Sequence, residues 1–282
     1  MNPSAATIEW PPCPGTPLLG ENEIHVWATI LNPPTNVLAN LVATLSADEM
    51  ERANRFKFEK HRNRYIAGRG ALRAILAQYF NTDAAALRFS YQENGKPALT
   101  GEVAGTGIHF NLAHTEDLAL MAVTRVGLVG VDVECVRPIK EMDALVERFF
   151  SSRESESFQK VSADQKPAAF FNLWTRKEAM LKATGEGITR SLSLVEVSFL
   201  PGEAARVVAI SGDAKAGERW CLREMTPAKG FTAAVAIEGG TLNIEHRTPN
   251  VEGGTLNIQH PTSNIQGGAQ IEIECWRWNC ES

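Results

Sequence analysis

Two carboxylates stand two positions apart in residues 129–134 (VGVDVE), a segment whose valines predict a β-strand. Side chains alternate along a strand, so Asp132 and Glu134 project from one face and the flanking valines project from the other, into a core. Neighbouring carboxylates repel each other unless a cation lies between them, and oxygen-only ligands suit Mg²⁺. The pattern therefore predicts a metal-binding face, with a solvated strand face as the alternative interpretation.

A third carboxylate lies in residues 174–182 (WTRKEAMLK), which have the pattern of a helix. Trp174, Glu178 and Lys182 are spaced four apart and would form one stripe on that helix. If the helix packs near the strand, Glu178 completes a three-carboxylate Mg²⁺ site, and Lys182 could neutralise a phosphate one turn further on. The alternative interpretation is a surface ion pair between Glu178 and Lys182 beside a core tryptophan.

Basic residues are concentrated in residues 52–73, where eight of them are accompanied by a single acid, Glu59. Four arginines at spacings of seven, seven and four would line one side of a continuous helix: Arg55, Arg62, Arg69 and Arg73. A guanidinium can bind two phosphate oxygens at once, so the cluster predicts an anion site. A solvated helix face is the alternative, and duplex DNA is disfavoured as the anion because the rest of the chain has an excess of acids.

Two short motifs separate the basic segment from the carboxylates. His114 lies in residues 110–115 (FNLAHT), which close a predicted strand, and loops gather ligand-binding groups at strand ends, although a lone histidine is usually structural. Residues 94–97 (NGKP) predict a turn, because Gly95 tolerates a positive φ and Pro97 fixes the exit. Turn formation alone would explain the second motif.

Short strands and longer helices alternate along the chain. Strands are predicted in the first half at residues 24–31, 87–91, 108–111 and 118–124. A helix is predicted to begin at the capping box of Ser46 and Glu49 and to reach about Phe80, with a break near Lys60 as an alternative. The second half predicts a strand at 128–133, helices at about 141–158 and 165–184, and strands at 195–200, 206–210, 220–224 and 231–237. We therefore predict an α+β protein of two similar halves, each with a long helix beside short strands.

The bulk composition excludes several classes of protein. The chain has 282 residues, a net charge of −5 and five scattered cysteines. The charge argues against a nucleic-acid partner, and cysteines that are odd in number and lack paired spacing argue against a disulfide framework. The N-terminus lacks the basic and apolar regions of a signal peptide, and no apolar run approaches the roughly 18 residues of a membrane span. We expect a cytoplasmic protein without a membrane partner.

The two ends of the chain differ from the body. Residues 1–22 carry five prolines and are expected to form a loose arm. Near the other end, Gly239–His246 (GGTLNIEH) returns fourteen residues later as Gly253–His260 (GGTLNIQH). We predict that this repeat segment is a polar appendage, so that a chain stopped after Glu238 keeps its stability. The alternative is a small hairpin array that docks on the body through its tryptophans, Trp276 and Trp278.

These observations divide the chain into four parts. The predicted parts are a Pro-rich N-terminal arm (1–22), an N-terminal α+β half (23–125), a C-terminal α+β half with the metal site (126–238) and a repeat-containing tail (239–282). Because one chain contains both halves, we expect a monomer.

In their order along the chain, the motifs resemble the 4'-phosphopantetheinyl transferase superfamily, Sfp-type. The resemblance covers roughly residues 24–237 and excludes the repeat segment. It is carried by residues 68–73 (GRGALR), 94–97 (NGKP), 110–115 (FNLAHT), 130–134 (GVDVE) and 174–182 (WTRKEAMLK). The last two motifs are the most diagnostic of the family.

The resemblance implies two pseudo-symmetric α+β halves with coenzyme A bound in the cleft between them. It implies that the Mg²⁺ ligands are Asp132, Glu134 and Glu178, with Asp132 also beside the cofactor. It implies contacts to coenzyme A from His114 and Lys182 at the phosphates, from Gly95, Lys96 and Pro97 at the adenine, and from Arg55, Arg69 and Arg73 at the 3'-phosphate. Ala113 departs from the family, because many members have serine before the histidine, and a hydroxyl contact to the cofactor is therefore absent.

The implied reaction is attack by a carrier-protein serine on the β-phosphorus of coenzyme A, with release of 3',5'-ADP. Glu178, or a water that it orients, would be the base, and Lys182 would stabilise the phosphate charge. The partner would be an apo acyl or peptidyl carrier protein of fatty-acid, polyketide or nonribosomal-peptide synthesis. Two alternatives are another Mg²⁺-dependent phosphotransferase or nuclease, and a non-catalytic protein that binds coenzyme A or carriers.

Overall fold

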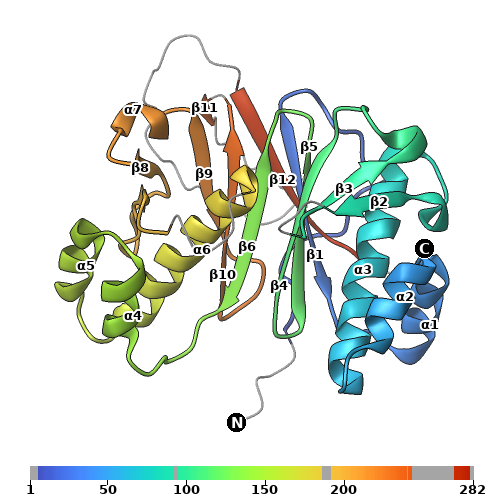
Figure 1. The fold of residues 1–282 in the computed structure, drawn as a ribbon, viewed down its shortest axis with the longest axis horizontal. Coiled ribbons are helices and arrows are strands. Elements are labelled where there is room, and N and C mark those ends of the chain that lie inside the picture. Colours follow the sequence, from blue (N-terminus) through green and yellow to red (C-terminus); the bar gives the residue numbers. More distant parts are fainter. Residues whose placement is uncertain (1–5, 92–94, 186–191, 240, 243–269, 280–282) are drawn as a thin grey trace, which may run out of the picture.

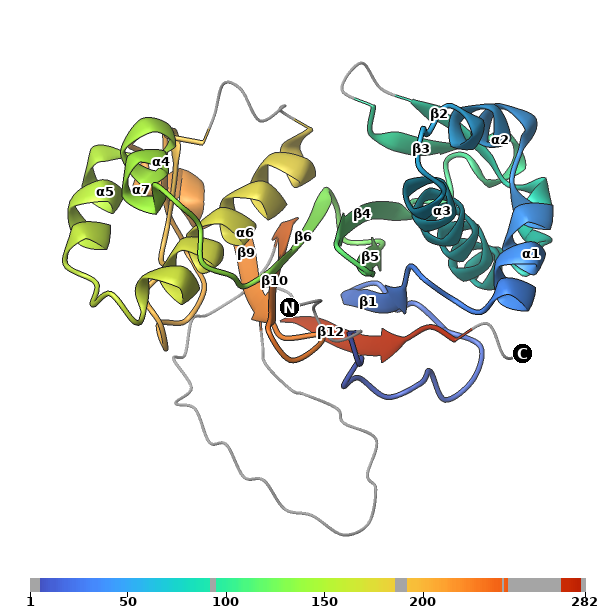
Figure 2. The same cartoon turned by 90° about the horizontal axis from the view of Figure 1, so that it is seen from below.

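The computed structural model describes residues 6–91, 95–185, 192–239, 241–242 and 270–279. Two α+β halves lie side by side, with their sheets facing each other at the centre of the molecule (Figure 1). A long helix covers the outer face of each sheet, so the layers follow the order helix, sheet, sheet, helix (Figure 2). The predicted α+β class with two halves is confirmed.

The N-terminal half is built on a five-stranded sheet in the order β11-β12-β1-β5-β4. Within it, β5 (Leu118–Thr124) pairs antiparallel with both of its neighbours, which are β1 (Glu23–Ile30) and β4 (His109–Thr115). The helices of this half are α1 (Thr35–Thr44), α2 (Ala47–Asn54) and α3 (Glu59–Phe80). Two further strands pair antiparallel beside α3: β2 (Arg88–Tyr91) and β3 (Pro97–Thr100). Short 3-10 helices occupy Ala84–Ala86 and Gly101–Val103.

The C-terminal half has a three-stranded antiparallel sheet in the order β6-β10-β9. Its strands are β6 (Val129–Cys135), β10 (Phe231–Glu238) and β9 (Trp220–Met225). Its helices are α4 (Met142–Phe149), α5 (Ser152–Gln159), α6 (Lys166–Thr184) and the short α7 (Ala214–Gly217). A separate antiparallel pair consists of β7 (Val195–Val197) and β8 (Val207–Ile210).

Clusters of buried apolar side chains hold the layers together. On α3, Leu72, Ile75 and Leu76 pack against Trp27 of β1. The two sheets meet through side chains that include Val26, Leu120, Val131, Val133 and Val235, which confirms the prediction that the valines of β6 point into a core. On the far side, α6 packs on β10 and β9 through side chains that include Leu173, Met180, Leu222 and Ala234.

Several elements differ from their predicted extents. The helix expected from Ser46 to Phe80 is broken between Asn54 and Glu59, as the alternative had it. The helix expected over 141–158 is two helices, because Phe150 is extended and Ser151 begins α5 with its own capping box. Helix α1 was not foreseen, since no side-chain cap and no acidic first turn mark its start. Nor was β3, which opens with Pro97, a residue without an N–H for a strand ladder.

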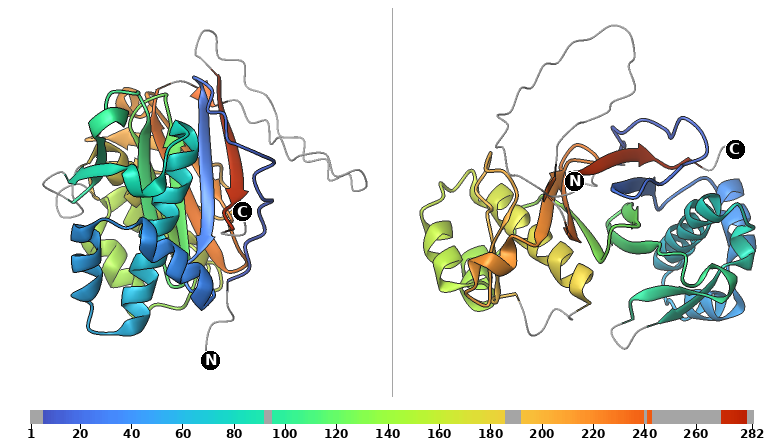
Figure 3. Two further views of the ribbon diagram at one scale, coloured as in Figure 1. Left: turned by 90° about the vertical axis from the view of Figure 1, so that its right-hand side faces the viewer. Right: turned by 90° about the horizontal axis from the view of Figure 1, so that it is seen from above.

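The expectation that residues after Glu238 form a polar appendage outside the fold is wrong for their described end. Strand β12 (Gln270–Arg277) pairs parallel with β1, in register from Glu23 with Glu272 to Ala28 with Arg277 (Figure 3). Ile271 is 0% exposed and Trp276 is 7% exposed. The physical reason is that β1 would otherwise be an open edge, and an alternating apolar segment can cover it. The two-residue β11 (Thr241–Leu242) pairs with β12, whereas both complete copies of the repeat extend beyond the described residues.

The N-terminal arm is also part of the fold, contrary to the expectation of a loose segment. Within its described residues, Ile8 is buried and forms a bridge with Ala228 of the C-terminal half. The amide of Arg277 on β12 donates to the carbonyl of Pro11 at 2.7 Å. The arm therefore contacts both β12 and the C-terminal half.

No helix among the described residues is long and apolar enough to cross a membrane.

Candidate active site

The candidate site lies where the edge strand β4 of one sheet meets the edge strand β6 of the other, beside α6. Helix α6 approaches β6 closely at Gly130, because a Cβ at that position would lie 2.0 Å from the carbonyl oxygen of Ala179 and 2.4 Å from the amide nitrogen of Ala183. Only glycine permits this contact between a helix backbone and a strand backbone. The contact brings Glu178 and Lys182 of α6 to the face of β6 that carries Asp132. The predicted packing of this helix near the strand is confirmed.

Asp132 and Lys182 form an ion pair across this contact, with Nζ 2.6 Å from Oδ1. Asp132 is 5% exposed. Burial raises the pKa of its carboxyl to about 7 against the lowering effect of Lys182, and the charges of Glu134 and Glu178 raise it further. The alternative of a surface ion pair between Glu178 and Lys182 is therefore wrong, since the lysine bonds to the strand aspartate instead.

Glu134 and Glu178 approach the same place from β6 and α6. The Thr115 hydroxyl of β4 donates to Oε2 of Glu134 at 3.1 Å, which joins the two sheets at the site. Glu178 lies on α6, and its side chain is buried. Burial raises the pKa of both carboxyls, and the bond from Thr115 partly offsets this for Glu134 as Lys182 does for Glu178. The pKa of all three predicted carboxyls is thus raised, because burial disfavours their charged forms.

The donor set fits a hard cation. Oδ2 of Asp132 and Oε1 of Glu178 are buried oxygens to which no described residue donates a hydrogen bond. Buried polar atoms are normally satisfied, so these two carboxylate oxygens are suited to bind a cation. Among the described residues, no three carboxylate, imidazole or thiol groups are close enough together in this structure to enclose a metal ion. The Lys182 ammonium bonds to the one Asp132 oxygen that has a partner.

His114 reaches the site from β4, as its predicted position near a strand end implies. Although the residue is exposed, desolvation by the surrounding protein lowers the pKa of its ring, and the positive charges of Lys182 and Arg64 lower it further. A neutral imidazole at neutral pH follows from this direction. Arg64, not singled out from the sequence, is held by Asp117, whose Oδ1 accepts from Nε at 2.9 Å.

The turn at residues 95–97 also reaches α6. Gly95 has a φ of 80°, which confirms its predicted role as a left-handed position, and Pro97 begins β3. Nζ of Lys96 lies 2.6 Å from the carbonyl oxygen of Lys182. The structure therefore brings this motif to the predicted site, through a contact that the sequence does not indicate.

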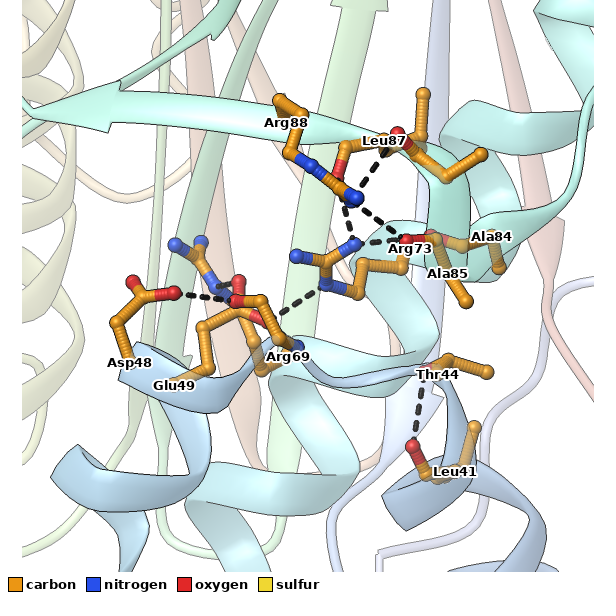
Figure 4. Close-up of polar contacts among 12 residues, drawn as sticks. Leu41, Thr44, Asp48, Glu49, Arg69, Arg73, Ala84, Ala85, Leu87 and Arg88 are labelled. Carbon is orange, nitrogen blue, oxygen red and sulfur yellow. Dashed lines mark hydrogen bonds and ion pairs between the residues drawn. The ribbon is translucent and has the colours of Figure 1, made fainter.

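The predicted arginine cluster is not assembled as one row. Arg69 and Arg73 point together at Glu49 of α2, with Nε–oxygen distances of 2.5 and 2.6 Å to its two carboxylate oxygens (Figure 4). Arg73 is 1% exposed and also donates to the carbonyls of Ala84 and Leu87. Arg55 lies apart at the end of α2, where its exposed side chain is 2.5 Å from Glu51. The break between α2 and α3 separates it from the other two arginines.

Four buried charged side chains that the sequence does not single out as functional form hydrogen bonds near the site: Glu49, Glu154, Arg176 and Lys177. Glu49 is the predicted capping-box residue, and besides accepting from the Ser46 amide at 2.9 Å it bonds to both arginines. Next to Glu178, Lys177 bonds to Glu154 and to the carbonyl of Leu192, and Arg176 donates to the carbonyl of Ser198 at 2.5 Å. A capping-box pattern is the only sequence signal for Glu49 and Glu154.

Comparisons with known proteins bear on both halves. Residues 30–125 match a family model described as "4'-phosphopantetheinyl transferase, N-terminal", and residues 128–236 match "4'-phosphopantetheinyl transferase superfamily". The chain is 41% identical over 230 residues to the 4'-phosphopantetheinyl transferase HetI of Nostoc sp., covering 82% of this chain and 94% of that protein. It is 28% identical over 153 residues to the 4'-phosphopantetheinyl transferase Sfp of Bacillus subtilis, covering 54% and 66% of the two chains.

Among solved structures, the chain is similar to the Helicobacter pylori holo-[acyl-carrier-protein] synthase, crystallised in complex with coenzyme A. The identity is 21% and the TM-score 0.28, with 39% of this chain and 98% of that chain covered. A likeness at this level does not bear on the fold or the site. The relationship to known proteins therefore rests on the sequence comparisons.

Proposed function

The chain belongs to the 4'-phosphopantetheinyl transferase superfamily, and on that premise we propose that it transfers the 4'-phosphopantetheine of coenzyme A to a serine of an apo carrier protein, with release of 3',5'-ADP. It is an enzyme of this family, whose acceptors are carrier proteins. The observation that carries the proposal is the Asp132–Lys182 pair beside two unpaired carboxylate oxygens, at the junction of the two halves. A metal-dependent phosphoryl-group transfer needs these groups together.

The three carboxylates have distinct surroundings that suit this reaction. Asp132 and Glu178 would hold Mg²⁺ through their unpaired oxygens, with Glu134 as the third ligand that the resemblance implies, and the ion when bound would supply positive charge near the phosphates. As the described structure stands, the three carboxylates are not close enough together to enclose the ion. Glu178 would accept the proton of the carrier serine, directly or through a water that it orients. Lys182 lies beside Asp132. In that position its ammonium would also stabilise the charge of a phosphate oxygen.

Coenzyme A would be bound from both halves. His114 has a lowered pKa, so its neutral ring would offer a hydrogen bond to a phosphate rather than a charge. The 95–97 turn beside the adenine stays a prediction. So does the 3'-phosphate role of Arg55, Arg69 and Arg73, and the enclosure of Arg73 by Glu49 and two backbone carbonyls argues against its share of that role.

The test is modification of a panel of apo acyl and peptidyl carrier proteins from fatty-acid, polyketide and nonribosomal-peptide synthases. We expect a mass increase of one phosphopantetheine on the carrier, with one 3',5'-ADP released per carrier and no transfer when Mg²⁺ is chelated. The folded variants Asp132→Ala and Glu178→Ala should lose transfer. Release of 3',5'-ADP without a carrier, or hydrolysis of nucleic acid, would contradict the proposal and favour another phosphotransferase or a nuclease.

A further inference from the structure

The Lys96 side chain reaches from the N-terminal half into the C-terminal half at the site. Lys96 lies between β2 and β3, and its ammonium is 2.6 Å from the carbonyl oxygen of Lys182 and 3.3 Å from that of Ala183. The carbonyl oxygen of Val129, where β6 begins, lies 3.4 Å away. Three backbone oxygens thus surround one ammonium, two from the last turn of α6 and one from the strand that α6 packs on.

The end of α6 is a place where a cation stabilises the backbone. The last carbonyls of a helix have no partner within the helix and carry the negative end of its dipole. In α6, Gly185 adopts a left-handed conformation with its amide directed to the carbonyl of Leu181, and Lys96 binds the next two carbonyls from another part of the molecule. Lys96 is partly buried there, and desolvation lowers its pKa. A hydrogen bond from a charged ammonium to a backbone carbonyl is stronger than one between two neutral groups.

The β-strands on either side of Lys96 are held against α3 at the end next to the lysine, where Tyr91 pairs with Pro97. The Arg69 guanidinium lies 4.8 Å from the ring centroid of Phe89 and 5.3 Å from that of Tyr91, and it bonds to the Tyr91 hydroxyl. Glu49 holds Arg69 in turn, within the network described above. A lysine on strands held in this way can fix the position of the helix that it contacts.

We propose that Lys96 is a positioning residue, which holds the last turn of α6 against the start of β6 and so keeps Lys182 beside Asp132. The contact and the Lys182–Asp132 pair share one residue, because Lys96 binds the backbone carbonyl of Lys182 and Asp132 binds its side chain. Its effect on transfer rests on the proposed function, whereas its effect on the helix end does not.

The first test measures hydrogen exchange of the backbone amides in residues 178–185 of the full-length protein, without coenzyme A. Lys96→Met should accelerate exchange at the end of α6 about tenfold, the order expected when a hydrogen bond from a charged donor is removed. Lys96→Arg should retain most of the protection, and Lys229→Met, at an exposed lysine before β10, should exchange like the unaltered protein. Unchanged exchange in Lys96→Met would overturn the proposal. If that variant does not fold, Lys96→Gln is measured instead, with the same two outcomes.

The second test separates positioning from direct binding of the cofactor. Loss of the contact should lower kcat for carrier modification about tenfold while KM for coenzyme A changes by less than about threefold, because the interaction acts on the reacting site. A large increase in KM for coenzyme A with unchanged hydrogen exchange would mean that Lys96 binds the cofactor and does not position α6. If the unaltered protein modifies no carrier, the proposed function fails while the exchange experiment still decides the role of Lys96.

Discussion

In the N-terminal half, one buried carboxylate is the ion-pair partner of two buried arginines. Glu49 is 1% exposed and bonds to two arginines, and hydrogen bonds to it outweigh its desolvation so that its pKa is lowered. Its pKa would rise if it were simply buried, so the arginines keep it ionised. A charge buried in this way is costly to leave without its partner. The network therefore ties α2 to α3 and, through Arg69, to the strands that carry Lys96.

Replacing Glu49 by glutamine should destabilise the protein by about 3–5 kcal/mol, because two buried guanidiniums lose their counter-charge. The matched control is Glu51→Gln on the same helix, whose exposed pair with Arg55 should contribute less than about 1 kcal/mol. Urea unfolding followed by circular dichroism measures both variants. Equal stabilities of the two would contradict a structural role for the buried network.

The carboxylates of the site are expected to lower the stability of the metal-free protein. Burial raises the folded-state pKa of Glu178 above its ordinary 4.5, so the folded protein favours the protonated form. Its contribution to stability is therefore complete below pH 4.5 and is lost as the pH rises through the raised pKa. The uncharged Glu178→Gln variant does not titrate at this position. It should melt at a higher temperature than the unaltered protein at pH 8, and the difference should vanish towards pH 4.

The same variant should lose transfer activity by about 10²–10⁴-fold, the usual contribution of a general base, and more if the metal is also lost. Thermal melts in the presence of a chelator, together with carrier modification in Mg²⁺, measure both properties. A variant less stable than the unaltered protein at pH 8 would show that Glu178 stabilises the fold, which contradicts its assignment to the reaction.

At the scale of elements, the site depends on how closely one helix approaches one strand. Gly130→Ala would place a methyl group 2.0 Å from a backbone oxygen of α6, so the helix must shift. We expect a loss of about 1–3 kcal/mol of stability, typical of overpacking, and a large fall in kcat as Lys182 moves from Asp132. Gly15→Ala is the control, since nothing lies within 4 Å of a Cβ there. Full activity of Gly130→Ala would contradict the role of this contact in forming the site.

At the scale of the whole molecule, the last described strand completes the first sheet. Trp276 of β12 lies 4.9 Å from Trp27 and 4.5 Å from His25, measured between ring centroids. His25 is itself buried and lies 2.8 Å from the hydroxyl of Tyr79 on α3. β12 thus connects the far end of the chain to the core of the N-terminal half.

A chain stopped after Glu238 should therefore lose most of its stability, contrary to the expectation from the repeats. Removal of Trp276 alone should cost about 3–5 kcal/mol, the usual effect of replacing a buried tryptophan by alanine. The control is a chain stopped after Asn279, which retains β12. Thermal melts and carrier modification are measured for the full-length protein, for the two truncated chains and for Trp276→Ala. A truncated chain that melts like the full-length protein would show that β12 is dispensable.

Local sequence determined the elements whose signals are local. The alternation in residues 129–134 placed Asp132 and Glu134 on one strand face, and the i, i+4 spacing placed Glu178 and Lys182 on one helix stripe. The Ser46–Glu49 capping box marked the start of α2, since a cap depends only on residues three apart. The order of the motifs was enough to indicate the family, because that order requires no knowledge of their spatial contacts.

Tertiary structure alone decided the partners. Nothing in the spacing of Glu178 and Lys182 shows that the lysine bonds to Asp132, which is fifty residues away. Likewise, Glu49 binds two arginines because a break in the backbone turns α2 against α3, and Lys96 reaches α6 because two halves meet. The role of β12 was hidden for the same reason: an alternating apolar segment after a polar repeat gains stability only when an open strand edge, more than two hundred residues earlier in the chain, lies beside it.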